Sequence, residues 1–290
     1  MESVEVTENW YTTKDNQQLF TRTWKAVGQV KANLVMVHGF GEHSGRYLDL
    51  FKQFSARGIE CYCWDQRGFG ETAKKSKGQG NNQGWDKVLG DVDDAVLRHK
   101  KDNISLILMG HSMGGEIVLS YLANGDKYKG VAKVTAAISS APLVRVVNAP
   151  PAPIFFALKN LAAPLLPWYP YTVGLDPKGI SRDPQEVKRY KEDPLVNDTA
   201  TLATLKSMLA NGELVLNSLA AKITTPILVV HGTADPYNSY EAAKQAYERI
   251  GSTDKAFHTY EGCYHELHYE LPEDKQRVTE DYLQWIESHE

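Results

Sequence analysis

Cysteine is scarce in this chain: its 290 residues include only Cys61, Cys63 and Cys263. The number is odd, and the first two cysteines stand two positions apart in a stretch that is predicted to be a buried strand. Neither a disulfide scaffold nor the ligand spacing of a zinc site is indicated. We therefore expect a protein that works without a metal ion or another cofactor.

Blocks of one residue class are absent as well. Lys and Arg number 32 against 36 Asp and Glu, for a net charge of -4, and no basic block argues for a nucleic-acid partner. No run of about eighteen apolar residues predicts a membrane-spanning helix. Residues 1–8 are acidic and lack the basic and apolar regions of a secretory signal, so we expect a cytoplasmic protein.

The most informative stretch runs from Gly110 to Gly115, reads GHSMGG and contains the pattern Gly-x-Ser-x-Gly. A strand-like apolar run at residues 105–109 precedes it, and a helix-like segment at residues 116–123 follows it. A strand, a sharp turn and a helix are the context of a nucleophile elbow, which exposes a serine hydroxyl above the sheet. Ser112 is therefore a candidate nucleophile. The alternative is a glycine-rich turn with an incidental serine.

Strand-like and helix-like segments alternate through most of the chain. Residues 4–11 and 18–24 predict a hairpin, and further strands are expected at 32–38, 59–64, 105–109, 131–138, 226–231 and 256–260. Helices are expected at 47–56, 84–100, 116–123, 240–250 and 272–288. The alternation predicts an α/β fold with a mostly parallel eight-stranded sheet and helices on both faces. It stops at residues 143–222, which we expect to be inserted into a core of residues 1–142 and 223–290.

The reactive side chains of such a sheet are expected at the carboxyl ends of its strands. A serine hydroxyl attacks an ester only when a base takes its proton and a third group orients that base. Asp235 follows the strand at 226–231 and His265 follows the last strand, which offers a triad in the order Ser112, Asp235, His265. The alternatives are a turn aspartate and a solvated loop histidine, and His268 competes for the role of base.

Two backbone N–H groups are expected to bind the oxyanion that forms when a carbonyl is attacked. One belongs to the residue after the nucleophile, Met113, and the other to Phe40, in the glycine-rich loop after the strand at 32–38. The alternative role of Phe40 is a wall of the acyl pocket.

Several segments together resemble the monoacylglycerol lipases of the serine α/β-hydrolase family. They are HGFGEHSGRY at 38–47, DQRGFG at 65–70, the elbow, DPL at 193–195, HGTAD at 231–235 and YEGCYHELH at 260–268. The resemblance spans nearly the whole predicted core and implies the α/β-hydrolase fold. It also implies that monoacylglycerol is cleaved to fatty acid and glycerol through an acyl-enzyme, with Ser112, Asp235 and His265 as nucleophile, acid and base.

The same resemblance assigns further roles by position. It implies an oxyanion hole formed by the N–H groups of Phe40 and Met113. It also implies that four polar side chains hold the glycerol end of the substrate, namely Glu42, Arg46, Tyr190 and His268. For Glu42 and Arg46 the alternative is a structural ion pair.

The inserted residues 143–222 are expected to form a cap over the site. Their proline-rich part, around residues 149–171, resembles the family least. Its apolar side chains either pack against the mouth of the site or also form an exposed patch that rests on lipid, at the surface of a membrane or lipid droplet. The patch would consist of Phe155, Phe156, Leu158, Leu161, Leu165, Leu166 and Trp168.

Two other functions fit the same motifs. One is a broader carboxylesterase, lysophospholipase or thioesterase on the same scaffold. The other is a binding protein that keeps the fold without the chemistry, although the presence of all three triad residues argues against it.

Overall fold

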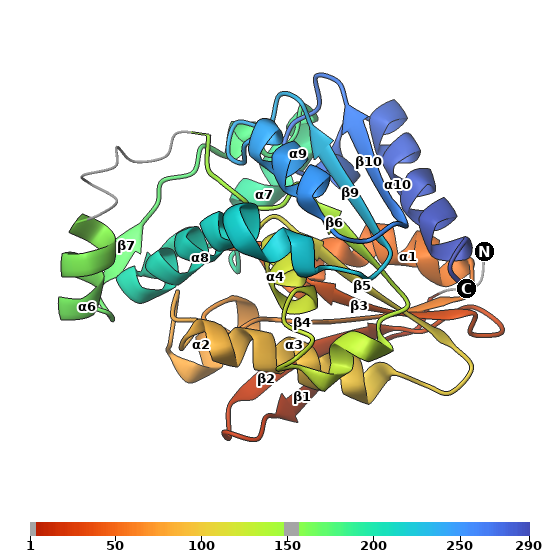
Figure 1. Cartoon of the computed structure of the whole chain (residues 1–290), viewed down its shortest axis with the longest axis horizontal. Helices are drawn as coiled ribbons and strands as arrows, with labels where there is room; N and C mark the ends of the chain where they lie inside the picture. Colours follow the sequence, from red (N-terminus) through yellow and green to blue (C-terminus); the bar gives the residue numbers. More distant parts are fainter. Residues whose placement is uncertain (1–3, 148–156) are drawn as a thin grey trace.

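The computed structural model describes residues 4–147 and 157–290. Its centre is an eight-stranded sheet with the order β1-β2-β4-β3-β5-β6-β9-β10 (Figure 1). The strands are β1 Val6–Thr12, β2 Gln18–Trp24, β3 Ala32–Val37, β4 Ile59–Trp64, β5 Ser105–His111, β6 Ala136–Ser140, β9 Ile227–Gly232 and β10 Lys255–Tyr260. β2 pairs antiparallel with β1 and β4, and all other neighbours are parallel. The predicted mostly parallel eight-stranded sheet is confirmed.

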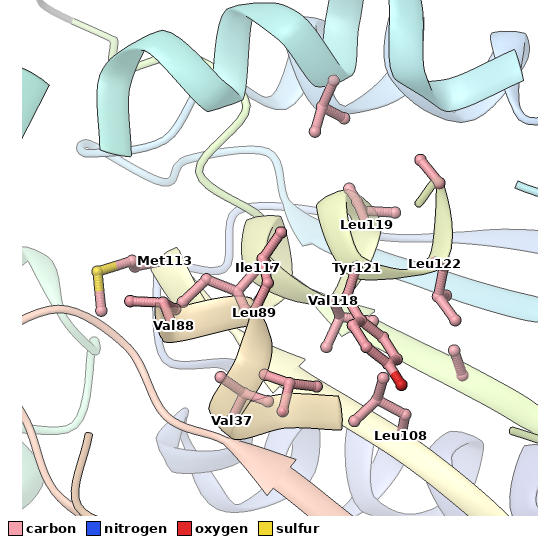
Figure 2. Packing of buried hydrophobic residues seen from close by; sticks show 14 of the residues in the cluster. Val37, Val88, Leu89, Leu108, Met113, Ile117, Val118, Leu119, Tyr121 and Leu122 are labelled. Atoms are coloured by element: carbon pink, nitrogen blue, oxygen red, sulfur yellow. The ribbon is translucent and has the colours of Figure 1, made fainter. Parts of the chain in front are cut away.

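Helices cover both faces of the sheet because its central strands are apolar on both sides. Leu34 and Met36 of β3 pack into one cluster with α1 Leu48–Ala56 and α10 Pro272–Glu287. Val35 and Val37 point the other way and pack with α3 Trp85–His99, α4 Met113–Leu122 and α9 Tyr240–Arg249. Figure 2 shows this second cluster, in which Leu108 of β5 lies below Val118 and Tyr121 of α4.

The strand predicted at residues 131–138 is wrong in its bounds. Residues Lys129–Lys133 form a 3-10 turn, and β6 begins only at Ala136. The N–H of Gly130 donates to the carboxylate of Asp93 on α3 at 2.7 Å, which holds this apolar stretch against the helix rather than in the sheet. Helices α2, Gly70–Ser76, and α7, Pro184–Glu192, were not predicted.

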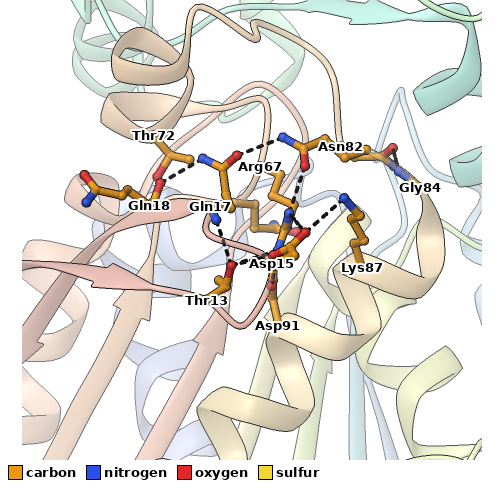
Figure 3. Close-up of polar contacts among 12 residues, drawn as sticks. Thr13, Asp15, Gln17, Gln18, Arg67, Thr72, Asn82, Gly84, Lys87 and Asp91 are labelled. Carbon is orange, nitrogen blue, oxygen red and sulfur yellow. Dashed lines mark hydrogen bonds and ion pairs between the residues drawn. The ribbon is translucent and has the colours of Figure 1, made fainter.

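In the loop after β4, the side chain of Arg67 joins three segments (Figure 3). Its buried guanidinium contacts both carboxylate oxygens of Asp91 on α3, at 2.7 and 2.9 Å. It also contacts both carboxylate oxygens of Asp15, in the β1–β2 turn, at 2.9 and 2.7 Å. The paired carboxylates offset the cost of burying the cation, so the DQRGFG segment has a structural role here.

The chain between β6 and β9 forms small elements of its own. They are a π-helical turn Leu158–Ala162, α6 Ala163–Leu165, β7 Pro170–Thr172, a 3-10 turn Pro177–Gly179, α7, β8 Thr199–Thr201, α8 Leu202–Leu214, a π-helical turn Val215–Leu219 and a 3-10 turn Ala220–Lys222. β7 and β8 pair antiparallel. In Figure 1, α6 and β7 lie at one end of the molecule, away from the main sheet. The division into a core and a cap at residues 143–222 stays a prediction.

Across residues 4–147 and 157–290, the structure contains no helix with both the length and the apolar character needed to cross a bilayer.

Candidate active site

Ser112 lies in a sharp turn between the end of β5 and the start of α4. Its backbone has φ 55° and ψ -119°, in the left-handed range that a residue with a Cβ rarely adopts. A Cβ on Gly110 would collide with the carbonyl oxygen of Gly114, and a Cβ on Gly114 would collide with that of Val37. The two glycines therefore let β5 and α4 approach closely enough to form the turn.

Asp235 and His265 come together from the ends of neighbouring strands. Asp235 follows β9, His265 follows β10, and Asp235 Oδ2 lies 2.7 Å from His265 Nδ1. The other carboxylate oxygen accepts hydrogen bonds from the N–H groups of Tyr237, at 2.9 Å, and Asn238, at 3.0 Å. Both side chains are buried, with 7% of each residue exposed. The contact leaves His265 Nε2 as the nitrogen available for another partner.

The charges of this pair reinforce each other. Burial alone would raise the pKa of Asp235, but the nearby imidazoles of His265 and His231 hold it well below its usual range. Burial alone would lower the pKa of His265, because it opposes the charged form. The Asp235 carboxylate has the larger effect and raises the pKa of this imidazole above its ordinary value. The arrangement favours a histidine that can take up a proton.

His268, the competing base, lies elsewhere in the same cluster. It is stacked on Tyr47, with 5.3 Å between ring centroids, and neither of its nitrogens has a hydrogen-bond partner among the described residues. Burial lowers its pKa to about 3. Since His265 and not His268 contacts Asp235, the geometry favours His265 as the base.

Residues near the pair that the sequence reasoning missed include His111, His231 and Asn238. His111 lies between His265 and His268, at ring distances of 4.8 and 5.1 Å. His231 Nε2 is 3.2 Å from Asp235 Oδ2, and Asn238 Nδ2 donates to Ser112 Oγ at 3.4 Å. The only sequence signal was their position: His111 precedes the nucleophile, and His231 and Asn238 flank Asp235 in HGTADPYN.

The two expected oxyanion donors stand at suitable places in the backbone. Met113 is the first residue of α4, so its N–H has no acceptor within the helix. In the described part of the chain, neither this N–H nor that of Phe40 donates a hydrogen bond. The loop beside Phe40 is held by a hydrogen bond from Asn197 N to Gly41 O at 2.8 Å. The Phe40 ring packs edge-on against Phe69 with 5.5 Å between centroids.

The four candidate glycerol-binding residues are all buried, and Arg46 contacts two of the other three. Arg46 Nη2 is 2.5 Å from Glu266 Oε2, while Arg46 Nε is 3.5 Å from Glu42 Oε2, so the structural ion pair exists and includes a third residue. The guanidinium lies 4.8 Å from the ring centroid of Tyr190. Burial, with the Glu266 charge, raises the pKa of Glu42 to about 7.

Several polar atoms of this group form no hydrogen bond in the described part of the chain, although Glu42 Oε2 and Arg46 Nε face each other as an ion pair. Glu42 Oε2, Arg46 Nε and both nitrogens of His268 form no hydrogen bond within the described residues, although they are buried. Buried polar atoms normally find partners, so such a set marks a place where a polar molecule can bind. Among residues 4–147 and 157–290, no group of three or more His, Cys, Asp or Glu residues is arranged to hold a metal ion.

The family described as "Serine aminopeptidase, S33" matches residues 28–272, which is most of the chain. The chain belongs to this family. The matched residues begin just before β3 and end at the first residue of α10. They include every candidate site residue named above.

Individual relatives also match most of the chain. The chain is 34% identical to a putative monoglyceride lipase of Schizosaccharomyces pombe, over 93% of this chain and 71% of the relative. It is 32% identical to a monoacylglycerol lipase of Mycolicibacterium smegmatis, over 92% and 91%. The crystal structure of Paleococcus ferrophilus monoacylglycerol lipase superimposes with a TM-score of 0.82 at 28% identity, covering 94% of this chain and 99% of that one. The α/β-hydrolase fold is thereby confirmed.

Apolar side chains are exposed on the segment between β6 and β9. Leu165 and Trp168 have 73% and 69% of their surface exposed, and smaller fractions are exposed at Leu161, Leu166, Tyr169 and Tyr171. We call these six residues the apolar patch. Phe155 and Phe156, which were expected to belong to it, and the side chain of Leu158 lie outside what the structure describes.

Proposed function

We propose that this protein hydrolyses monoacylglycerols to a fatty acid and glycerol, with Ser112, Asp235 and His265 as its catalytic triad. The short contact between Asp235 and His265, beside a serine held in a strained elbow, carries the chemical part of this proposal. The substrate class is supported by relatives that are named monoglyceride or monoacylglycerol lipases and match nearly the whole chain.

In the proposed reaction, Ser112 Oγ attacks the ester carbonyl carbon while its proton moves to His265 Nε2. Asp235 holds the ring by Nδ1 and stabilises the imidazolium. The oxyanion accepts hydrogen bonds from the N–H groups of Phe40 and Met113, each worth about 2.7–4 kcal/mol in comparable sites. His265 then gives the proton to the glycerol oxygen as the ester C–O bond breaks. Water repeats the sequence on the acyl-enzyme and releases the fatty acid.

The glycerol end of the substrate is assigned to Glu42, Arg46, Tyr190 and His268. Their support is the group of buried polar atoms that form no hydrogen bond among the described residues, because hydroxyl groups can both donate and accept hydrogen bonds there. Glu42 Oε2 accepts, Arg46 Nε donates, and the neutral ring of His268 can do either through its two nitrogens.

We also propose that the apolar patch rests on a lipid surface, either a membrane or a lipid droplet. A substrate that partitions into lipid must be extracted from it, and six exposed apolar side chains on neighbouring small elements suit shallow insertion. The segment at 143–222 would then act as the cap through which the acyl chain enters.

A substrate profile tests the proposed function. We expect kcat/KM to be highest for monoacylglycerols, measured over graded acyl chains and both positions of the glycerol ester. Controls are di- and triacylglycerols, short-chain nitrophenyl esters, lysophospholipids, acyl thioesters and an aminoacyl nitroanilide. A higher kcat/KM for nitrophenyl esters, lysophospholipids or thioesters would favour the broader esterase, and hydrolysis of the nitroanilide alone would favour a peptidase.

A further inference from the structure

Asn238 contacts both the nucleophile and its orienting acid. Its side-chain Nδ2 donates to Ser112 Oγ at 3.4 Å, and its backbone N–H donates to Asp235 Oδ1 at 3.0 Å. The residue is 2% exposed, so water does not compete for these contacts. Since Ser112 Oγ is the atom that forms and breaks the acyl bond in the proposed function, a donor on this atom bears on the chemistry.

The orientation of the Asn238 amide follows from a second contact. The same Nδ2 donates to the carbonyl oxygen of Ala141 at 2.8 Å. A carbonyl oxygen can only accept, so this end of the amide must be the NH₂ group. One of its hydrogens satisfies Ala141, and the other is free to point at Ser112.

Ala141 presents its carbonyl from a strained backbone. Its φ is 44°, in the left-handed region, although it has a Cβ and is fully buried. A hydrogen bond from its N–H to Val230 O, at 2.8 Å, holds the residue in place. Such strain persists where the surrounding structure fixes it, and it is frequent at functional sites.

The backbone of Asn238 is fixed from the other side as well. It forms an antiparallel bridge with Val146. On either side of that bridge, Val147 N donates to Tyr237 O at 2.7 Å and Ser239 N donates to Arg145 O at 2.8 Å. The segment after β6 therefore clamps the loop that carries Asp235, and the amide reaches Ser112 from a rigid base.

We propose that Asn238 is a fourth catalytic residue, which donates a hydrogen bond from Nδ2 to Ser112 Oγ as this oxygen attacks and again as it leaves. This inference rests on the proposed function. The Ser112 proton still moves to His265, and the amide keeps its own protons throughout. By occupying a lone pair of Oγ, the amide also directs the hydroxyl hydrogen away from itself. The contact of 3.4 Å is long for the resting hydroxyl and is expected to shorten as negative charge develops on Oγ.

The substitution Asn238→Leu removes both donors while nearly keeping the side-chain shape. We expect kcat and the second-order rate of labelling by a fluorophosphonate to fall by the same factor of about ten, which corresponds to about 1.4 kcal/mol. KM should stay unchanged, because the lost contact is to Oγ and not to the substrate. The backbone bond to Asp235 remains, so the acid limb of the pH profile should not move.

Asn124→Leu is the matched control. The Asn124 amide also donates to a backbone carbonyl, that of Ser120 at 2.7 Å, but it lies past the far end of α4. This variant should keep the wild-type kcat and labelling rate. If Asn238→Leu is labelled at the wild-type rate, or changes KM alone, the role of Asn238 is wrong. If the wild type itself is not labelled on Ser112, the proposed function fails instead.

A structure of the wild-type fluorophosphonate adduct decides the matter even where Asn238→Leu does not fold. There the Ser112 Oγ is bonded to phosphorus, as it is bonded to carbon in the reaction. We expect Asn238 Nδ2 within about 3.2 Å of this oxygen. An amide turned away from Oγ in the adduct would overturn the inference.

Discussion

The imidazole of His265 is held by Asp235, whose Oδ2 lies 2.7 Å from its Nδ1, and both groups are buried. This contact fixes which nitrogen can act as a base, and it couples the charge of the ring to that of the carboxylate. The pH dependence of turnover is therefore a direct consequence of the geometry.

Turnover should fall on the acid side with a midpoint above that of an ordinary histidine. His265 must be neutral to accept the Ser112 proton, and the Asp235 carboxylate raises its pKa, so protonation inactivates it at a higher pH. Asp235→Asn should move this midpoint of kcat/KM down and lower kcat by about 10⁴. Measurement of kcat/KM across the pH range checks both.

Asp281→Asn provides the control for that experiment. Asp281 also contacts a histidine, with its Oδ2 3.0 Å from His258 Nδ1, but this pair lies at the surface and away from Ser112. The variant should keep the wild-type midpoint on the acid side of the kcat/KM profile. A midpoint in Asp235→Asn equal to that of the wild type would show that His265 is not the titrating base.

Glu116 makes stability depend on pH. It lies fully buried in the first turn of α4, and in the described chain neither carboxyl oxygen has a hydrogen-bond partner. Burial raises its pKa well above its usual range, so the folded state holds a proton that the unfolded state loses above about pH 4.5. The free energy of unfolding should therefore fall as the pH rises, by up to about 1.4 kcal/mol per pH unit.

Glu116→Gln removes this titration. In urea unfolding at pH 5 and pH 7, the free energy of unfolding of the variant should rise relative to that of the wild type as the pH rises. Glu192→Gln, the same change at an exposed position of α7, should follow the wild type at both values. If the difference in free energy of unfolding between Glu116→Gln and the wild type does not change with pH, Glu116 is not buried in its protonated form.

The elbow should not tolerate a methyl group at Gly114. A Cβ there would overlap the carbonyl oxygen of Val37, and neither backbone can move without disturbing the sheet. We expect Gly114→Ala to lower the free energy of unfolding by about 3 kcal/mol or more. Gly90→Ala is the matched control, since it lies within α3 with no atom near its Cβ position and should stabilise the helix by about 0.5–1 kcal/mol. Urea unfolding that finds the two variants equally stable would contradict the elbow geometry.

Lipid binding should depend on the apolar patch. The double variant Leu165→Ser and Trp168→Ser removes its two most exposed members. Each side chain is worth about 1.5–3 kcal/mol when fully buried, so co-sedimentation with phospholipid vesicles should weaken by at least about tenfold. Hydrolysis of a dissolved short-chain ester should be unchanged.

The matched double variant is Trp10→Ser and Leu97→Ser. Both residues are exposed, but on β1 and α3 rather than on the patch. This control should bind vesicles as the wild type does. Equal vesicle binding by both double variants would rule out docking through the patch.

The centre of the sheet was predictable because its strands are buried on both faces. β3 and β5 appear in the sequence as continuous apolar runs, and the glycines at 110 and 114 mark the sharp turn between β5 and α4. The run at 131–138 has the composition of a strand throughout, but β6 begins only at Ala136. Gly130, just before the run, is bonded to Asp93 of α3, and no local pattern reveals this tertiary contact. The start of α7 did carry a local signal, because Asp183 caps a helix with proline at its first position.

The candidate site was predictable only where a motif fixes it. Ser112, Asp235 and His265 follow strands, so their approach follows from the order of the sheet. The contacts of His111, His231 and Asn238 depend instead on which side-chain atoms meet across loops. Residue type alone does not distinguish a buried histidine beside Asp235 from one in the core, and only the coordinates reveal that Asn238 reaches Ser112.

The turnover of a monoacylglycerol by Ser112→Ala is the most direct test of the proposed function. Ser120→Ala is its control, because Ser120 lies on α4, is buried and has no hydrogen-bond partner for its hydroxyl among the described residues. We predict that Ser112→Ala lowers kcat by about 10⁶ while Ser120→Ala keeps the wild-type rate. Substantial hydrolysis by folded Ser112→Ala would contradict the assignment of this serine as the nucleophile.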